Sequence, residues 1–292
     1  MKQLCITRRE ALAEFAGMGL AMTPAISALA ADAQRPFKIG ACDWSLGHGG
    51  KSSAMKFARE IGLDGVQVSF GEPGGPHDLR QEENRNETVR AAKQYNVKIA
   101  SLAMGILNRV PYASSPDAER WVHECIDVMP KMQQRIVLLA FFGKGDIKDK
   151  PELIREVIRR LKRVAPEAEQ AGVVLGIETW LNADAHIRIL DAVGSPAVQV
   201  YYDTANMEKQ GYDIYAEIRR LGRQRICQFH CKENSCLLGK GRIDFRKVKD
   251  AMDAIGYRGW LVIESAVGKE MNVRDSYVHN QEYLRSIFPT EA

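Results

Sequence analysis

The chain has 292 residues, of which 45% are apolar and 27% are charged, and its net charge is +4. This is the composition of an ordinary globular protein with enough apolar material for a sizeable core. The basic pairs, such as Arg159-Arg160 and Arg219-Arg220, stand among acidic residues on expected helices. They therefore indicate solvated helix surfaces, and we expect no nucleic-acid partner.

The first thirty residues have the features of an export signal. The twin arginines Arg8-Arg9 precede an apolar stretch from Phe15 to Leu29, and Ala28-Leu29-Ala30 is a small-residue cleavage motif. This order of features predicts a Tat signal peptide over residues 1–30 and a periplasmic or otherwise exported protein. The alternative is an N-terminal amphipathic helix. No later stretch reaches the roughly 18 apolar residues of a membrane span, so no membrane partner is expected after cleavage.

From residue 36 to residue 288, short apolar runs alternate with longer amphipathic ones. We expect Pro166 to kink or reset the helix over residues 151–171. The expected strands lie at 37–44, 65–70, 97–104, 135–142, 173–178, 197–202, 225–229 and 260–263. The expected helices lie at 52–61, 86–95, 117–132, 151–171, 183–193, 212–221, 245–255 and 275–288.

Alternating strands and helices of this kind predict a parallel sheet with the helices outside it. Eight such units favour closure into one (β/α)8 barrel, a TIM barrel of the α/β class, over residues 36–288. The alternative is an open doubly wound sheet, which often carries a glycine-rich phosphate loop after its first strand. Gly47-His48-Gly49-Gly50 follows the first strand without the full spacing of that motif.

Four apolar runs each stop on a side chain that can bind a metal ion, namely Glu178, Asp203, His230 and Glu264. Each one alone is more simply explained as a helix cap, a turn residue or a buried histidine. In a barrel, however, the carboxyl ends of the strands share one face, where the four would meet. Three carboxylates clustered without a cation would repel one another. The set predicts one divalent ion, Mn²⁺ or Mg²⁺ by preference, with Co²⁺ or Zn²⁺ as alternatives.

The cysteines predict neither a disulfide framework nor a structural zinc site. Five of the six cysteines lie outside the expected signal, and an odd number cannot all pair. Cys227, Cys231 and Cys236 surround His230 without the short C-x-x-C spacing of zinc sites. Alternation along a strand would also place Cys227 and His230 on opposite faces. The redox state of the five cysteines stays open.

Several of these motifs together resemble the xylose isomerase-like TIM-barrel superfamily. Asp203-Thr204-Ala205-Asn206, His230-Cys231-Lys232-Glu233 and the segment from Gly256 to Glu264 are most similar to its sugar (phosphate) isomerase and epimerase branch. The resemblance implies that Glu178 and Glu264 bind the metal and act as the acid/base pair, and that Asp203 and His230 complete the metal site. A metal chelated by a ketose would acidify the neighbouring C–H and stabilise an enediolate. The two carboxylates would then move the proton.

Two positions depart from the ketose 3-epimerases of that branch. Those enzymes carry a His where this chain has Asn206, and an Arg where it has Cys236. The departures argue against ketose 3-epimerisation more than against metal-dependent chemistry. Asn206, Lys232 and Arg242 are the expected substrate contacts instead. The alternative for Lys232 and Arg242 is that they are solvated charges of loops. The endonuclease IV type of DNA-repair enzyme is also similar at residues 203–206, but the six histidines of this chain do not supply its three-zinc site.

The resemblance therefore implies a metal-dependent isomerase or epimerase of a sugar or a sugar-like polyol. Because sugar phosphates are cytoplasmic metabolites, the expected export favours an unphosphorylated carbohydrate substrate. One alternative is a lyase that acts on a keto-sugar or a 3-keto-glycoside by the same chemistry. Another is a non-catalytic sugar-binding barrel, although binding alone would not need both Glu178 and Glu264. The sequence leaves the oligomeric state open, and a homo-oligomer is compatible with it.

Overall fold

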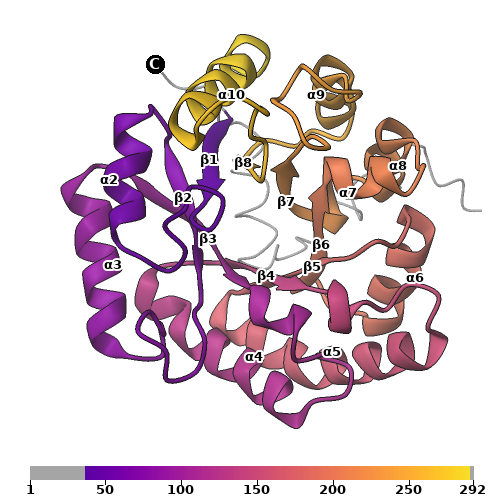
Figure 1. Cartoon of the computed structure of the whole chain (residues 1–292). Helices are drawn as coiled ribbons and strands as arrows, with labels where there is room; N and C mark the ends of the chain where they lie inside the picture. Colours follow the sequence, from indigo (N-terminus) through magenta and orange to yellow (C-terminus); the bar gives the residue numbers. More distant parts are fainter. Residues whose placement is uncertain (1–36, 290–292) are drawn as a thin grey trace, which may run out of the picture.

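The computed structural model describes residues 37–289, and its eight parallel strands close into a barrel surrounded by helices (Figure 1). Each strand pairs with the next in sequence order, and the pairing of the first strand with the last closes the ring. The predicted α/β class and the single (β/α)8 barrel are confirmed. The strands are β1 (Lys38–Cys42), β2 (Gly65–Ser69), β3 (Lys98–Met104), β4 (Ile136–Ala140), β5 (Val174–Glu178), β6 (Val198–Asp203), β7 (Ile226–Cys231) and β8 (Trp260–Ile263).

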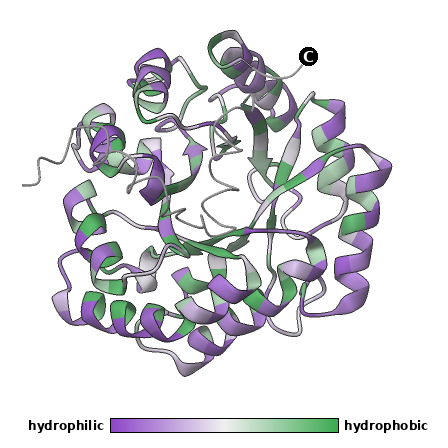
Figure 2. Cartoon of the chain, turned by 180° about the vertical axis from the view of Figure 1, so that it is seen from behind, coloured by the Kyte–Doolittle hydropathy of each residue, from purple (hydrophilic) through white to green (hydrophobic). Residues whose placement is uncertain are grey.

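The helices pack around the outside of the strands because most of them have one apolar side, and Figure 2 shows hydrophobic and hydrophilic residues mixed along them. Short 3₁₀ helices are η2 (Gly105–Asn108), η3 (Pro130–Met132), η4 (Gly143–Gly145) and η5 (Arg223–Arg225). The α-helices are α2 (Ser53–Glu60), α3 (Glu82–Gln94), α4 (Pro116–Val128), α5 (Pro151–Ala171), α6 (Ala183–Val193), α7 (Thr204–Lys209), α8 (Ile214–Leu221), α9 (Phe245–Ala254) and α10 (Val273–Ile287).

Three local expectations need correction. Helix α5 continues through Pro166 without a reset, because that residue lies on the exposed side of the helix, where water can replace the lost hydrogen bond. Helix α3 begins at Glu82, four residues earlier than the predicted start at 86. A short helix, α7, follows Asp203, where no helix was expected, because the carboxylate of Asp203 accepts a hydrogen bond from the Asn206 N–H and caps it.

The inside of the barrel is partly polar. Gln67, Ser101 and Gln228 are completely buried there, next to a small apolar cluster that contains Tyr201 and Cys227. Cys227 faces inward together with His230, contrary to simple alternation. The pairing of β6 with β7 shifts register after Val200, so that Cys227 is the extra residue of a bulge.

None of the helices within residues 37–289 is long and apolar enough to cross a membrane. The predicted signal peptide over residues 1–30 lies outside the described residues. Export is therefore still a prediction from the sequence.

Candidate metal centre

The four residues predicted to share an ion lie together at the carboxyl ends of the last four strands. Glu178 and Asp203 are the final residues of β5 and β6, His230 lies near the end of β7, and Glu264 directly follows β8. Each offers one ligand atom, and these atoms all lie within 4.8 Å of one another. The parallel direction of the strands explains this convergence, since every strand delivers its last residue to the same mouth.

His230 lies at the centre of this group. Its Nδ1 atom is 2.9 Å from Glu178 Oε1 and 3.8 Å from both Asp203 Oδ2 and Glu264 Oε2. His230 and Asp203 are completely buried. Three carboxylates held this close in a buried site need a positive charge between them. The arrangement therefore favours a cation at this position.

Asp203 has one oxygen to spare for such an ion. Its Oδ1 accepts a hydrogen bond of 2.7 Å from the Asn206 N–H, while the buried Oδ2 makes no hydrogen bond within residues 37–289. Burial raises the pKa of Asp203 to about 8, although the nearby Lys232 opposes this. The Lys232 ammonium lies 3.7 Å from Asp203 Oδ2, beyond hydrogen-bond distance, and a buried carboxylate oxygen without a hydrogen bond is costly unless a cation satisfies it. One carboxylate thus has both of the roles considered from the sequence, as helix cap and as candidate ligand.

Gln67, on β2, fixes which nitrogen of His230 faces the carboxylates. The Gln67 amide nitrogen donates to the hydroxyls of Ser101 and Tyr201, both at 3.0 Å, so its oxygen points toward the imidazole. That oxygen is 2.7 Å from His230 Nε2. Because a carbonyl oxygen only accepts, Nε2 carries a proton, and Nδ1 is the nitrogen that faces the carboxylates and would bind a metal ion. This is how protein metal sites commonly orient a histidine ligand.

Gln67 was not among the predicted site residues. A signal was present, since this amide stands between Val66 and Val68 in a strand whose neighbours are apolar. A buried polar residue at that place needs partners inside the barrel. The identity of those partners, on β1, β3, β6 and β7, follows only from closure of the sheet.

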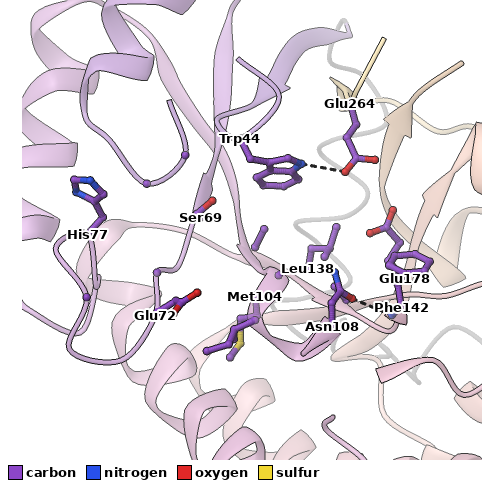
Figure 3. Close-up of a pocket in the computed structure, with 18 of the residues that line it drawn as sticks. Trp44, Ser69, Glu72, His77, Met104, Asn108, Leu138, Phe142, Glu178 and Glu264 are labelled. Carbon is purple, nitrogen blue, oxygen red and sulfur yellow. Dashed lines mark hydrogen bonds between the residues drawn. The ribbon is translucent and has the colours of Figure 1, made fainter. Parts of the chain in front are cut away.

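Glu264 is held from two sides. Its Oε2 is 2.7 Å from the Lys232 ammonium, and its Oε1 accepts a hydrogen bond of 3.1 Å from the Trp44 indole N–H (Figure 3). Burial raises the pKa of Glu264, but the Lys232 ammonium and its hydrogen bond to the carboxylate oppose burial, and the pKa is lowered. Glu264 is therefore a carboxylate across the whole working pH range.

Trp44 was also absent from the predicted site. Trp44 belongs to the loop that follows β1. Hydrogen bonds to the neighbouring Asp43 fix the conformation of this loop. The Asp43 carboxylate accepts hydrogen bonds from the backbone N–H groups of Gly50 and Ser69, at 2.9 and 2.8 Å. The loop is thereby folded back over the mouth of the barrel, and the indole reaches Glu264.

A cavity of about 680 Å³ opens above this group, and Figure 3 shows it running from Glu264 and Glu178 toward Glu72 and His77. Asn206 and Lys232, two of the expected substrate contacts, line it. Arg242 does not belong to this lining. Its side chain is 73% exposed, and its guanidinium pairs with Glu208 at 2.9 Å.

The residues present fit a divalent ion. Three carboxylates and one imidazole nitrogen form a donor set rich in oxygen, as Mn²⁺ and Mg²⁺ prefer, and Co²⁺ or Zn²⁺ would also accept it. The Asp203 oxygen without a hydrogen bond and the direction of His230 Nδ1 toward the carboxylates both favour a cation in this place. The donor set does not select one metal among these.

Known proteins similar to this chain are sugar epimerases. The chain is 26% identical over 222 residues to a 2-epi-5-epi-valiolone 7-phosphate 2-epimerase from Actinoplanes sp., covering 74% of this chain and 82% of that protein. It is 24% identical over 231 residues to an L-ribulose-5-phosphate 3-epimerase from Escherichia coli, covering 72% and 80%.

Solved structures share the fold at lower identity. A D-psicose 3-epimerase from Clostridium cellulolyticum H10 superposes with a TM-score of 0.74 at 18% identity, over 86% of this chain and 99% of that one. A 3-keto-D-glucoside 4-epimerase from E. coli gives 0.70 at 16%, over 86% and 99%. The model of the xylose isomerase-like TIM barrel matches residues 55–287. The chain therefore belongs to the xylose isomerase-like TIM barrel family.

Proposed function

We propose that this protein is a divalent-metal-dependent isomerase or epimerase of an unphosphorylated sugar or sugar-like polyol. The observation that carries the proposal is the position of Glu178 and Glu264, which lie in one group of candidate ligands and also line one cavity. The epimerase names of the relatives support the reaction class. Binding alone would not need two such carboxylates in contact with the substrate space.

Glu264 is suited to remove a proton from a carbon atom. It is ionised, and Trp44 and Lys232 hold both of its oxygens in place, so its orientation is fixed before the substrate arrives. Glu178, on β5, lines the same cavity and would return a proton from another direction, which inverts the carbon centre. A bound divalent ion supplies positive charge that polarises the sugar carbonyl and acidifies the adjacent C–H.

Lys232 and Asn206 are proposed to hold the hydroxyl groups of the substrate. The Lys232 ammonium has three donor hydrogens, and the bond to Glu264 uses one of them. The Asn206 side chain can both donate and accept, as a sugar hydroxyl does. Burial opposes protonation of Lys232, but the charges of Asp203 and Glu264 outweigh it and raise the pKa of this ammonium. Lys232 is thus a fixed donor.

The scarcity of positively charged side chains in the cavity supports an unphosphorylated substrate. Among the described residues that line it, Lys232 is the only lysine or arginine, and Glu264 already engages it. Phosphate recognition generally relies on Arg or Lys side chains, or on backbone N–H groups at a helix N-terminus. This chain would therefore differ from the two relatives above, whose names specify phosphorylated sugars.

Export through the Tat pathway is the second part of the proposal, and residues 1–30 alone support it. Fractionation of cells that express the full chain should place a shortened protein in the periplasm. A chain with both Arg8 and Arg9 changed to Lys should stay in the cytoplasm at full length. A full-length protein in the cytoplasm from both chains would contradict export.

Exchange of carbon-bound hydrogen with solvent deuterium tests the reaction class. We expect the Mn²⁺-loaded protein to incorporate deuterium next to the carbonyl of a free keto-sugar, and to act poorly on the matching phosphate. No exchange across a panel of sugars would contradict the proposal and favour a non-catalytic sugar-binding barrel. A strong preference for the phosphates would contradict the unphosphorylated substrate.

A lyase acting on a keto-sugar or 3-keto-glycoside is the second candidate, and the size of the cavity favours it. A volume of about 680 Å³ leaves room for a leaving group beyond the sugar ring. Analysis of the products distinguishes the two reactions. An isomerase or epimerase conserves the mass of its substrate, whereas a lyase releases an aglycone.

A further inference from the structure

The cavity is larger than the proposed reaction requires. A single hexose has twelve heavy atoms and fills at most about 360 Å³, if each heavy atom takes the roughly 30 Å³ of one water molecule in the liquid. The cavity measures about 680 Å³. Much of it therefore lies beyond a sugar ring placed against Glu178 and Glu264. We call this outer part the apolar arm and define it by Met104, Ile106, Leu138 and Phe142.

The walls of the arm come from β3, β4 and the segments that follow these strands. Met104 and Leu138 are strand residues, Ile106 belongs to η2, and Phe142 follows β4. The Phe142 ring contacts the Trp180 ring, which also lines the cavity, with their centroids 5.3 Å apart. Apolar and aromatic walls with few polar groups are typical of pockets that bind a ring.

Three of the polar side chains that line the cavity already have a partner for at least one of their atoms. The Asn108 side-chain oxygen accepts a hydrogen bond of 2.9 Å from the Phe142 N–H (Figure 3). The Ser69 hydroxyl donates to Asp43 at 2.6 Å, and the Glu72 carboxylate pairs with Arg109 at 2.6 Å. A second sugar ring would lose hydrogen bonds to water here and find few replacements. An apolar ring would lose none.

We propose that the substrate is a keto-glycoside whose aglycone is aromatic or similarly apolar, and that the aglycone lies in the apolar arm. The sugar ring then lies against Glu178, Glu264 and Lys232. This inference rests on the proposed function and adds a substrate class to it. It also explains why the cavity is lined by apolar groups on one side and by the reacting carboxylates on the other.

A substitution at Gly105 can place a side chain in the apolar arm. It lines the cavity at the start of η2, and a Cβ atom added there would meet no atom within 4 Å. The position is not among the residues with positive φ, so a side chain causes no backbone strain. Gly105→Leu should fill the arm, whereas Gly105→Ala adds one methyl group and serves as the matched control. Neither change touches the candidate metal ligands.

Calorimetric binding of phenyl and methyl β-D-glucopyranoside to the Mn²⁺-loaded protein tests the inference. We expect the phenyl glycoside to bind tighter by about tenfold or more, because the arm removes its ring from water. Gly105→Ala should keep this preference. Gly105→Leu should abolish it and leave methyl glycoside binding within about twofold, since its ring is bound elsewhere.

Three results would overturn the inference: equal binding of the two glycosides by the unmodified protein, equal weakening of both by Gly105→Leu, or no binding of either. Deuterium exchange on the corresponding 3-keto-glycosides separates this inference from the reaction class. If exchange fails but the phenyl preference is present and is lost in Gly105→Leu, the proposed reaction is wrong and the apolar arm is a binding site for the aglycone.

Discussion

The hydrogen bond between Gln67 and His230 gives a sharp test of the metal centre. Gln67→Met keeps the length of the side chain and removes the oxygen that lies 2.7 Å from His230 Nε2. The imidazole then loses the group that fixes its proton on Nε2. It becomes free to place that proton on Nδ1, the atom that faces the carboxylates.

The expected loss of metal affinity follows from the loss of this fixed orientation of the imidazole. Removing an outer partner of a histidine ligand typically weakens metal binding by about 10–100-fold, or about 1.4–2.8 kcal/mol. We expect the lower half of this range, because Cys42 Sγ lies 3.4 Å from the same nitrogen and can restrain the ring in part. The Ser101 and Tyr201 hydroxyls lose the same partner, so the free energy of unfolding should also fall by about 1–3 kcal/mol.

Competition of Mn²⁺ binding against a fluorescent chelator measures the affinity of the folded variant. Gln228→Met is the matched control, because Gln228 is equally buried in the barrel and bonds the Ala100 carbonyl at 3.2 Å instead of the imidazole. Its metal affinity should equal that of the unmodified protein. Unchanged affinity in a folded Gln67→Met variant, or equal weakening in both variants, would refute the proposed role of Gln67.

Three further outcomes are expected. Glu178→Gln and Glu264→Gln should each lower kcat by roughly 10²–10⁴-fold in a deuterium exchange assay, as loss of an acid/base group does; activity near that of the unmodified protein in either would exclude the residue from proton transfer. Removal of metal with a chelator should abolish exchange and lower the free energy of unfolding by about 2.7 kcal/mol relative to protein at 100 times the Kd of the ion; a protein equally stable and active without metal would contradict the metal site. Burial lowers the pKa of His186 to about 4, whereas the unfolded chain keeps about 6.5. The unfolded chain therefore binds an extra proton between these pH values, and stability falls by up to ~3 kcal/mol as pH drops from about 6.5 to about 4. Urea unfolding of His186→Gln should show a correspondingly smaller loss, and an identical pH dependence in both proteins would contradict this.

Much of the fold could be predicted because each unit carries its own periodicity. Helix α6 begins at Ala183 and ends at Val193, as expected, since Asn182 caps its start and Gly194 ends it in a left-handed conformation. The ends of helices are harder to predict where the sequence has no capping residue or terminal glycine. Helix α3 starts before the predicted residue because its first turn is entirely polar and has no apolar residue to mark the period.

The four candidate ligands were also predictable, because each follows an apolar run and parallel strands bring their ends together. Arg242 shows the limit of that reasoning. It lies in the loop before α9, and nothing local to the sequence fixes the direction of its side chain. In the structure it pairs with Glu208 outside the cavity lining.

The sequence by itself determined the order of strands and helices, the closure expected of eight units, and the residues that each strand delivers to the mouth of the barrel. Only the tertiary structure decided how those residues are supported. The contacts of His230 with Gln67, and of Glu264 with Trp44, join residues 163 and 220 positions apart. The physical reason is that periodicity reports which face of an element is buried, whereas hydrogen-bond partners depend on closure of the sheet and on loops that no local pattern specifies.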